Sequence, residues 1–303
     1  MDEGICKLVS GRRKKAIELF DQSLSYSENA VAYNFKATAF KLQGDNMQEA
    51  IDNYSLTIKM DSLNWLAYNS RGEEYLKKGD VKSALADFSS VIKLRPKNKT
   101  GYKNRGIIRM QNRQYVKAYR DFSFGVSLDT TDYDLYFNRA ICSISVKQYE
   151  NAHNDLNFIL RHKPRGYEAY YAKYKIEMLK NDSLSAIVYL DSASKFKRIS
   201  NNYNLEFLAL AKSLSDHQSI IKAYGRMIRF NPYNQKYLFE RAMVYYSNKE
   251  YSSAIGDFNK FLRRKEQPGK ALYYLGVSLK NLGKTELGGK YIKQAVENGF
   301  RPK

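Results

Sequence analysis

Small residues recur every 34 positions along the chain, and a large apolar residue follows each of them four positions later. The small-residue series, with one isoleucine as its exception, runs through Ala16, Ala50, Ala84, Ala118, Ala152, Ala186, Ile220, Ala254 and Gly288. The large residues that follow are Phe20, Tyr54, Phe88, Phe122, Leu156, Leu190, Tyr224, Phe258 and Ile292. Residues four positions apart share one face of an α-helix. The pattern therefore predicts one amphipathic helix in every 34-residue unit.

A second helix is predicted upstream of each of these helices. In most units another small residue lies twelve positions before the first, at Gly72, Gly106, Ala140, Ala242 and Gly276. Turn signals such as Gly79-Asp80 separate the two stretches, and prolines such as Pro96 follow the second stretch. Small side chains let two helix backbones approach where they cross, but a single hairpin cannot cover its own apolar face. The sequence thus predicts helix-turn-helix units that stack on one another.

This unit resembles the tetratricopeptide repeat, a helical hairpin of 34 residues with small residues at two fixed positions. The resemblance implies an all-α fold, a right-handed α-solenoid superhelix of stacked helix-turn-helix hairpins. It covers residues 1–303 as a single array of about nine repeats. These are 1–30 (partial), 31–64, 65–98, 99–132, 133–166, 167–200, 201–234, 235–268 and 269–303. Because the first repeat begins part-way into its first helix, the sequence suggests a truncated N-terminus.

Two departures from the repeat carry structural expectations. The stretch from Gly44 to Ala50 is one residue longer than the stretch from Gly79 to Ala84, so we expect the first helix of unit 31–64 to be shifted back by one residue. Tyr174 stands where the sister units have a small residue, as does Leu208 in the next unit.

The sequence contains no pattern that indicates catalysis, a metal or a cofactor. Its three histidines, His153, His162 and His217, lack the spacing of metal ligands. The segment Gly283-Lys284-Thr285 resembles the end of a phosphate loop, but Ser278 replaces the required glycine and no strand precedes it. Cys6 and Cys142 match no zinc or disulfide pattern. We therefore expect a non-enzymatic protein without a cofactor.

The resemblance also implies a partner-binding groove lined by the first helix of each unit. Carried over position by position, the groove residues are Asn69, Lys103, Asn104, Asp134, Phe137, Asn138, Glu168, Tyr171, Glu206, Phe239, Glu240 and Tyr246. Asparagine both donates and accepts, so Asn104 and Asn138 suit the backbone of a bound peptide. From Asp134 onward the set is aromatic, apolar and acidic, which favours partner segments with apolar anchors and Lys or Arg. Aromatic residues at helical spacing are equally typical of a core between repeats, and the sequence leaves both interpretations open.

Charge adds a second candidate surface. The net charge is +20, and almost all of it comes from residues 99–303, where Lys and Arg outnumber Asp and Glu by 18. Residues 95–120 contain no Asp or Glu. The candidate anion-binding residues in this stretch are Arg95, Lys97, Lys99, Arg105, Arg109 and Arg113. Such a surface attracts RNA or another polyanion, but it is also typical of a solvated exterior.

The favoured function is a protein-interaction scaffold that binds a peptide or helical segment of a protein partner along the groove. RNA or polyanion binding around residues 95–120 is the alternative, and nucleic acid is the less favoured partner. No apolar run approaches the ~20 residues that span a bilayer, so no membrane span is expected. The sequence favours the cytoplasm, or the periplasm or the exterior if a leader precedes Met1. It assigns no oligomeric state.

Overall fold

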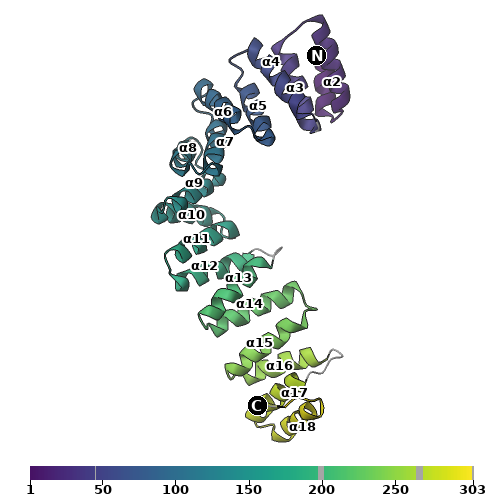
Figure 1. Ribbon diagram of the computed structural model, residues 1–303, viewed down its shortest axis with the longest axis vertical. Helices are drawn as coiled ribbons and strands as arrows, with labels where there is room; N and C mark the ends of the chain where they lie inside the picture. The colour runs from purple at the N-terminus through teal and green to yellow at the C-terminus, as the bar shows by residue number, and fades with distance from the viewer. Residues whose placement is uncertain (45, 197–200, 264–268, 302–303) are drawn as a thin grey trace. The chain divides into compact units, whose positions relative to one another are not determined.

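The structure, a computed structural model, describes residues 1–44, 46–196, 201–263 and 269–301. Every regular element in these ranges is an α-helix (Figure 1). The helices in the first half of the chain are α1 (Asp2–Val9), α2 (Arg13–Tyr26), α3 (Ala30–Gln43), α4 (Met47–Met60), α5 (Trp65–Lys78), α6 (Val81–Leu94), α7 (Lys99–Gln111), α8 (Tyr115–Leu128) and α9 (Tyr133–Ser145). Those that follow are α10 (Tyr149–His162), α11 (Tyr167–Leu179), α12 (Ser183–Phe196), α13 (Asn202–Ser213), α14 (His217–Phe230), α15 (Gln235–Ser247), α16 (Tyr251–Leu262), α17 (Gly269–Asn281) and α18 (Thr285–Glu297).

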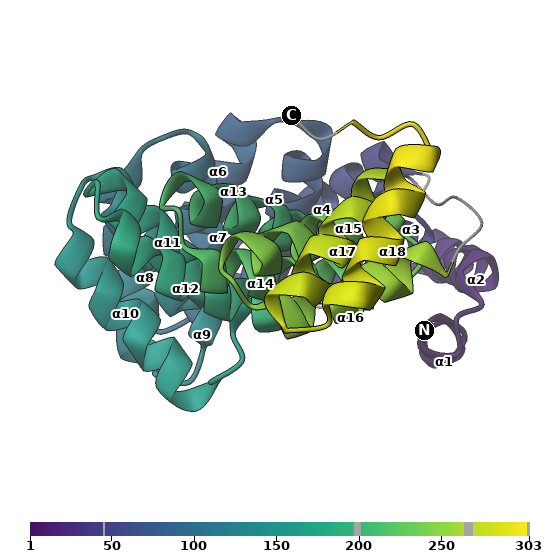
Figure 2. The ribbon, with the colours of Figure 1, turned by 90° about the horizontal axis from the view of Figure 1, so that it is seen from below.

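Consecutive helices pack against each other as hairpins, as α3 does with α4 and α5 with α6. The last hairpin, α17 and α18, shows its two helices side by side (Figure 2). Each hairpin within a compact unit also packs on the next, through contacts such as that of α4 with α5. The predicted all-α fold of stacked hairpins is therefore confirmed, while the right-handed superhelix stays a prediction.

The chain divides into two compact units, 1–155 and 156–303. The N-terminal unit has cores such as the one formed by Ala84, Phe88 and Ile108. The C-terminal unit has one core around Leu190 and Phe207 and another around Phe258. The nine repeat boundaries and the single array across residues 1–303 stay predictions.

Steric packing explains the small residues of the repeat. A β-carbon placed on Gly106 would lie 2.7 Å from the Phe122 ring, closer than real β-carbons come to other heavy atoms. Ala118 and Phe122 are themselves fully buried. The aromatic residue at this step is thus a core residue, and the small residue opposite makes room for its ring.

The predicted departures from the repeat also have a structural counterpart. In α3 the fully buried small residue is Ala37, which packs with Ala50 and Tyr54, while Thr38 lies only partly buried beside it. This position agrees with a first helix shifted back by one residue. Tyr174 and Leu208 are buried in the core of the C-terminal unit, so large side chains replace small ones there.

The turn inside each hairpin repeats as regularly as the helices. In seven successive hairpins, one turn residue adopts the left-handed conformation with φ between 54° and 84°, and these residues are spaced 34 positions apart. In chain order it is Gly79, Arg113, Lys147, Asn181, Ser215, Lys249 and Gly283. Glycine adopts this conformation without a steric penalty, whereas Arg113 and Lys147 hold it at a cost in backbone strain. Several of these turn residues disfavour the left-handed conformation, so the packing of the helices, and not the local sequence, fixes the geometry of the turn.

Candidate functional site

The first helices of the hairpins form a layer of their own within each unit. Although they are not consecutive in the chain, α3 contacts α5 and α7 contacts α9 in the N-terminal unit. In the C-terminal unit α15 contacts α17 in the same way. The groove residues predicted from the sequence all lie on these first helices. We call this surface the first-helix face of each unit.

Polar side chains connect three helices of the first-helix face in the N-terminal unit. Glu73 on α5 accepts hydrogen bonds from Lys41 Nζ on α3 (2.5 Å) and from Asn69 Nδ2 (2.8 Å). Asn69 Oδ1 in turn accepts from Asn104 Nδ2 on α7 (3.2 Å). Asn138 is partly buried on α9, and its side chain has no hydrogen-bond partner in the described ranges. Of the two predicted backbone-binding asparagines, Asn104 is thus held in place and Asn138 is available.

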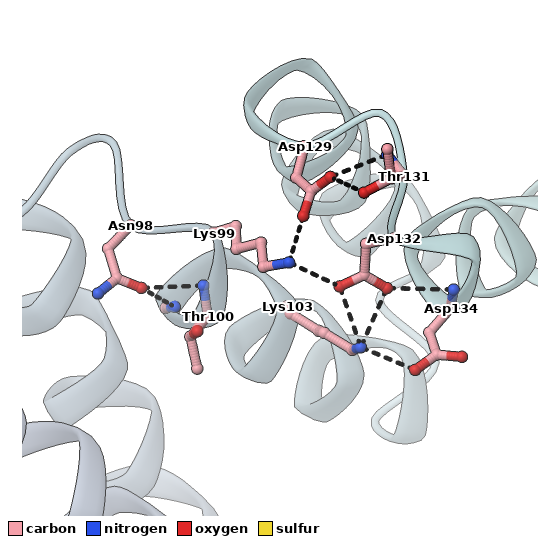
Figure 3. A network of polar contacts seen from close by, with 9 residues as sticks. Asn98, Lys99, Thr100, Lys103, Asp129, Thr131, Asp132 and Asp134 are labelled. Atoms are coloured by element: carbon pink, nitrogen blue, oxygen red, sulfur yellow. Dashed lines mark hydrogen bonds and ion pairs between the residues drawn. The ribbon is translucent and has the colours of Figure 1, made fainter.

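A cluster of lysine and aspartate side chains joins α7 to the start of α9 (Figure 3). Lys103 Nζ donates to Asp132 (3.2 Å) and to Asp134 (2.9 Å). Lys99 Nζ pairs with Asp129 and lies 3.5 Å from Asp132. Hydrogen bonds from Lys99 and Thr131 hold the pKa of the Asp129 carboxyl well below its usual value. Both lysines are therefore neutralised by carboxylates of the same unit.

Other members of the predicted anion-binding set are also committed to ion pairs. Asp121 is only 3% exposed, and its carboxylate accepts hydrogen bonds from Arg105 Nε (3.1 Å) and Nη2 (2.7 Å). Arg109 Nη1 donates to the same carboxylate (2.8 Å). In contrast, Arg95, Lys97 and Arg113 are exposed. Half of the six candidate residues thus stabilise the fold, and the other half face solvent.

The Arg105–Asp121 pair belongs to a repeated contact that the sequence analysis missed. An arginine on the first helix binds an aspartate sixteen residues later on the second helix of the same hairpin. The pairs are Arg71–Asp87, Arg105–Asp121, Arg139–Asp155 and Arg241–Asp257. The hydrogen bonds that Arg139 and Arg241 donate to Asp155 and Asp257 raise the pKa of both arginines, although burial opposes the shift. The constant spacing of sixteen in the sequence was the available signal.

In the C-terminal unit, the predicted groove residues Tyr171 on α11 and Glu206 on α13 bind each other. The Tyr171 hydroxyl donates to both Glu206 carboxylate oxygens, at 3.0 and 3.1 Å. Burial, together with this hydrogen bond, raises the pKa of Tyr171 to about 12. The ring stacks on Tyr203 at 4.6 Å, and the Lys175 ammonium lies 4.9 Å from its centroid. Glu168, one turn before Tyr171, is exposed.

The remaining predicted aromatics are packed on the core and still partly open. Phe137 on α9 is partly buried. Phe239 lies 5.4 Å from the ring of Phe261, and Tyr246 lies 4.8 Å from the ring of Tyr274. These rings are therefore packed against other aromatic or core residues and keep part of their surface open, and their role in a partner-binding groove stays a prediction.

The remaining acidic residue of the predicted groove also lies beside an aromatic ring. Glu240 on α15 is 3.5 Å from the Tyr224 hydroxyl on α14, and both belong to the C-terminal unit.

The described residues are also free of the features that mark two other kinds of site. They contain no group of three or more His, Cys, Asp and Glu side chains placed to hold a metal ion. Among their helices, none combines the length and apolar character needed to cross a membrane.

Comparison with known proteins shows one local sequence match and a shared fold. Residues 66–98 match the sequence profile of the tetratricopeptide repeat. No curated protein sequence matches the chain significantly. The fold is similar to that of the C-terminal part of a TPR repeat-containing protein from Cytophaga hutchinsonii, with a TM-score of 0.67 at 14% identity over 78% of this chain and 97% of the other.

Two further solved structures share the fold at low sequence identity. YrrB, described as a TPR protein with an unusual peptide-binding site, gives a TM-score of 0.56 at 19% identity over 65% of this chain and 99% of the other. MamA from Desulfovibrio magneticus RS-1, from residue 41 to its end, gives 0.53 at 17% identity over 56% and 95%. Residues 66–98 thus match the tetratricopeptide repeat profile, and the chain shares its fold of stacked hairpins with solved tetratricopeptide repeat proteins.

Proposed function

We propose that this chain is a non-enzymatic scaffold that binds a segment of a protein partner across the first-helix face. The observation that carries the proposal is a pair of exposed apolar side chains on neighbouring first helices of the C-terminal unit. Met178 on α11 is 37% exposed and Leu205 on α13 is 47% exposed. Exposed Glu168 lies on α11 as well. Apolar anchors with a carboxylate nearby suit a partner segment that carries apolar residues together with Lys or Arg.

The preorganised side chains of both units support the same function. The Tyr171–Glu206 pair and the Asn69–Asn104 pair each hold a polar group in one orientation, so a partner would meet side chains whose rotamer freedom is already lost. The relative YrrB, whose fold this chain shares, is described as peptide-binding. Asn138 adds an amide with both donor and acceptor capacity to the first-helix face of the N-terminal unit.

The test combines affinity capture from the native cell with a matched pair of surface variants. Leu205→Lys places a positive charge on the first-helix face, whereas Val188→Lys places the same charge on α12, a second helix, at a residue that is 61% exposed. We expect Val188→Lys to recover the partner as the unchanged chain does. Leu205→Lys should weaken binding by at least about tenfold, because the charge replaces an apolar anchor and repels the basic segment. Equal recovery by both variants would contradict the proposal.

Polyanion binding around residues 95–120 is the alternative, and it now depends on Arg95, Lys97 and Arg113 because their neighbours are ion-paired. If these three residues contact three phosphates of a single strand, a plot of the logarithm of the binding constant against the logarithm of the salt concentration should have a slope of only about −2. A salt titration with a single-stranded RNA measures this slope. A flat profile would remove the alternative.

A further inference from the structure

A cavity of about 660 Å³ lies between α12, α14 and α15 of the C-terminal unit, away from the groove residues described above. Five of the side chains that line it are basic and one is acidic. They are Lys195, Lys222, Arg226, Arg229, Arg241 and Asp191. Its size is in the range of small-ligand sites.

The positive charge of this cavity is only partly compensated. Arg226 donates through Nη2 to Asp191 (2.5 Å), so these two charges cancel. Lys195, Lys222 and Arg229 are exposed, and none of them is within ion-pair distance of a carboxylate in the described ranges. Three exposed cations without a carboxylate partner therefore line the cavity.

At the floor of the cavity, a polar side chain that other hairpins carry at the same step of the repeat is missing. In four hairpins, a polar residue stands sixteen positions before the cation at this step of the first helix: Ser55 before Arg71, Ser89 before Arg105, Ser123 before Arg139 and Asn157 before Lys173. Three of these residues accept a hydrogen bond: Arg71 Nη1 donates to Ser55 Oγ (2.9 Å), Arg105 Nη1 to Ser89 Oγ (3.4 Å), and Lys173 Nζ to Asn157 Oδ1 (2.7 Å). Ser123 Oγ is buried without a hydrogen-bond partner among the described residues. Each of these polar residues belongs to the second helix of the preceding hairpin. At Arg241 the corresponding residue is Gly225, which offers no side chain.

Arg241, which lines the cavity, is consequently left with a donor that no side chain of the preceding hairpin accepts from at this step. Its Nε and Nη2 bind Asp257 at 2.6 and 2.8 Å. Its Nη1 lies 3.2 Å from the place that a β-carbon on Gly225 would take, and it donates to no acceptor in the described ranges. Both Gly225 and Arg241 line the cavity. The missing side chain thus creates the floor of the cavity and exposes the guanidinium edge to it.

We propose that this cavity binds a phosphate group, with Arg241 Nη1 on the floor and Lys195, Lys222 and Arg229 in the lining. A phosphate carries up to two negative charges and several acceptor oxygens, which match one fixed donor and three exposed cations. Among the described residues, the lining holds no aromatic ring on which a base could stack, so a free phosphate or a phosphorylated side chain fits better than a nucleic-acid strand. This inference is independent of the first-helix face.

The test is titration calorimetry of the full chain with inorganic phosphate at constant ionic strength. Gly225→Ser restores the polar side chain found at Ser55 and Ser89, which captures Nη1 and fills the floor. The matched control is Gly256→Ser on α16, where a β-carbon would meet nothing within 4 Å. We expect saturable binding for the unchanged chain and for Gly256→Ser, and at least about tenfold weaker binding for Gly225→Ser. Far-ultraviolet circular dichroism checks that both variants fold.

Two further measurements sharpen the test. Lys222→Glu reverses one charge of the lining and should also weaken binding by at least about tenfold. A phosphoserine peptide that binds more tightly than inorganic phosphate would assign the site to a phosphorylated partner, and equal affinity would assign it to the free ion; both support the proposal. The proposal is overturned if the unchanged chain binds no phosphate, or if Gly225→Ser binds phosphate as well as Gly256→Ser does.

Discussion

Replacing Asp87 by asparagine tests whether the arginine–aspartate pairs hold the hairpins together. Arg71 donates to this carboxylate through Nε (2.9 Å) and Nη2 (2.8 Å), and the two side chains are only 17% and 5% exposed. Asparagine keeps the size of the side chain and one acceptor oxygen but removes the charge. The guanidinium is then left in a largely buried site with its charge uncompensated.

The magnitude follows from the burial of the pair. Removing one partner of a buried ion pair destabilises proteins by about 3–5 kcal/mol. The remaining acceptor oxygen and the exposed edge of Arg71 offset part of this loss, so we expect Asp87→Asn to lower the free energy of unfolding by about 2–3 kcal/mol. Ser55→Ala removes only the neutral acceptor of Arg71 Nη1 and should lower it by about 1 kcal/mol.

Urea titration at neutral pH measures both effects. Trp65, the single tryptophan, lies on α5 together with Arg71, so its fluorescence reports on the hairpin that contains the pair. Glu286→Gln serves as the exposed control: it breaks the Lys290–Glu286 pair, whose side chains are 70% and 87% exposed, and should change stability by less than about 0.5 kcal/mol. If Asp87→Asn changed the unfolding free energy as little as Glu286→Gln, the reasoning from burial would be refuted.

Three further predictions use other features of the fold. Burial raises the pKa of the Cys142 thiol to about 12, whereas Cys6 is exposed. A thiol reagent at pH 8 should therefore label only Cys6 until denaturant is added, and rapid labelling of both thiols in the native protein would contradict this. Lys147 holds a φ of 62°, so Lys147→Gly should raise the unfolding free energy by roughly 0.5 kcal/mol in a urea titration, and a loss of stability would be the contrary result. Asp216 is the N-cap of α14, and hydrogen bonds from Ser219 lower the pKa of its carboxyl group. The ionised carboxylate therefore stabilises the fold above the ordinary pKa of 3.8, and this contribution is lost as the pH falls through the lowered pKa of the folded protein. Asp216→Ala should therefore cost about 1 kcal/mol at pH 7 and progressively less below pH 3.8, and a pH-independent difference would contradict the assignment.

The site could be predicted from the sequence only as far as its placement on helices. The small residues at steps of 34 locate the first helices, and Asn69, Asn104 and Tyr171 lie on them as expected. The partners of these residues could not be predicted, because Asn69 and Asn104 meet across 35 positions through the packing of two hairpins. The charge of residues 95–120 was likewise misleading in part, since the acids that neutralise Arg105 and Lys99 lie just beyond that stretch.

The sequence by itself determined the hairpins, because their periodicity depends on contacts within a few turns of helix and on the repeated fit of a small residue against a large one. Only the tertiary structure decided which polar groups are satisfied. Arg71 and Arg241 occupy the same step of the repeat, yet the first donates to Ser55 while the second faces Gly225 and a basic cavity. That difference arises where neighbouring hairpins meet, because the free energy of a buried charge is set by all the groups packed around it and not by its neighbours in the chain.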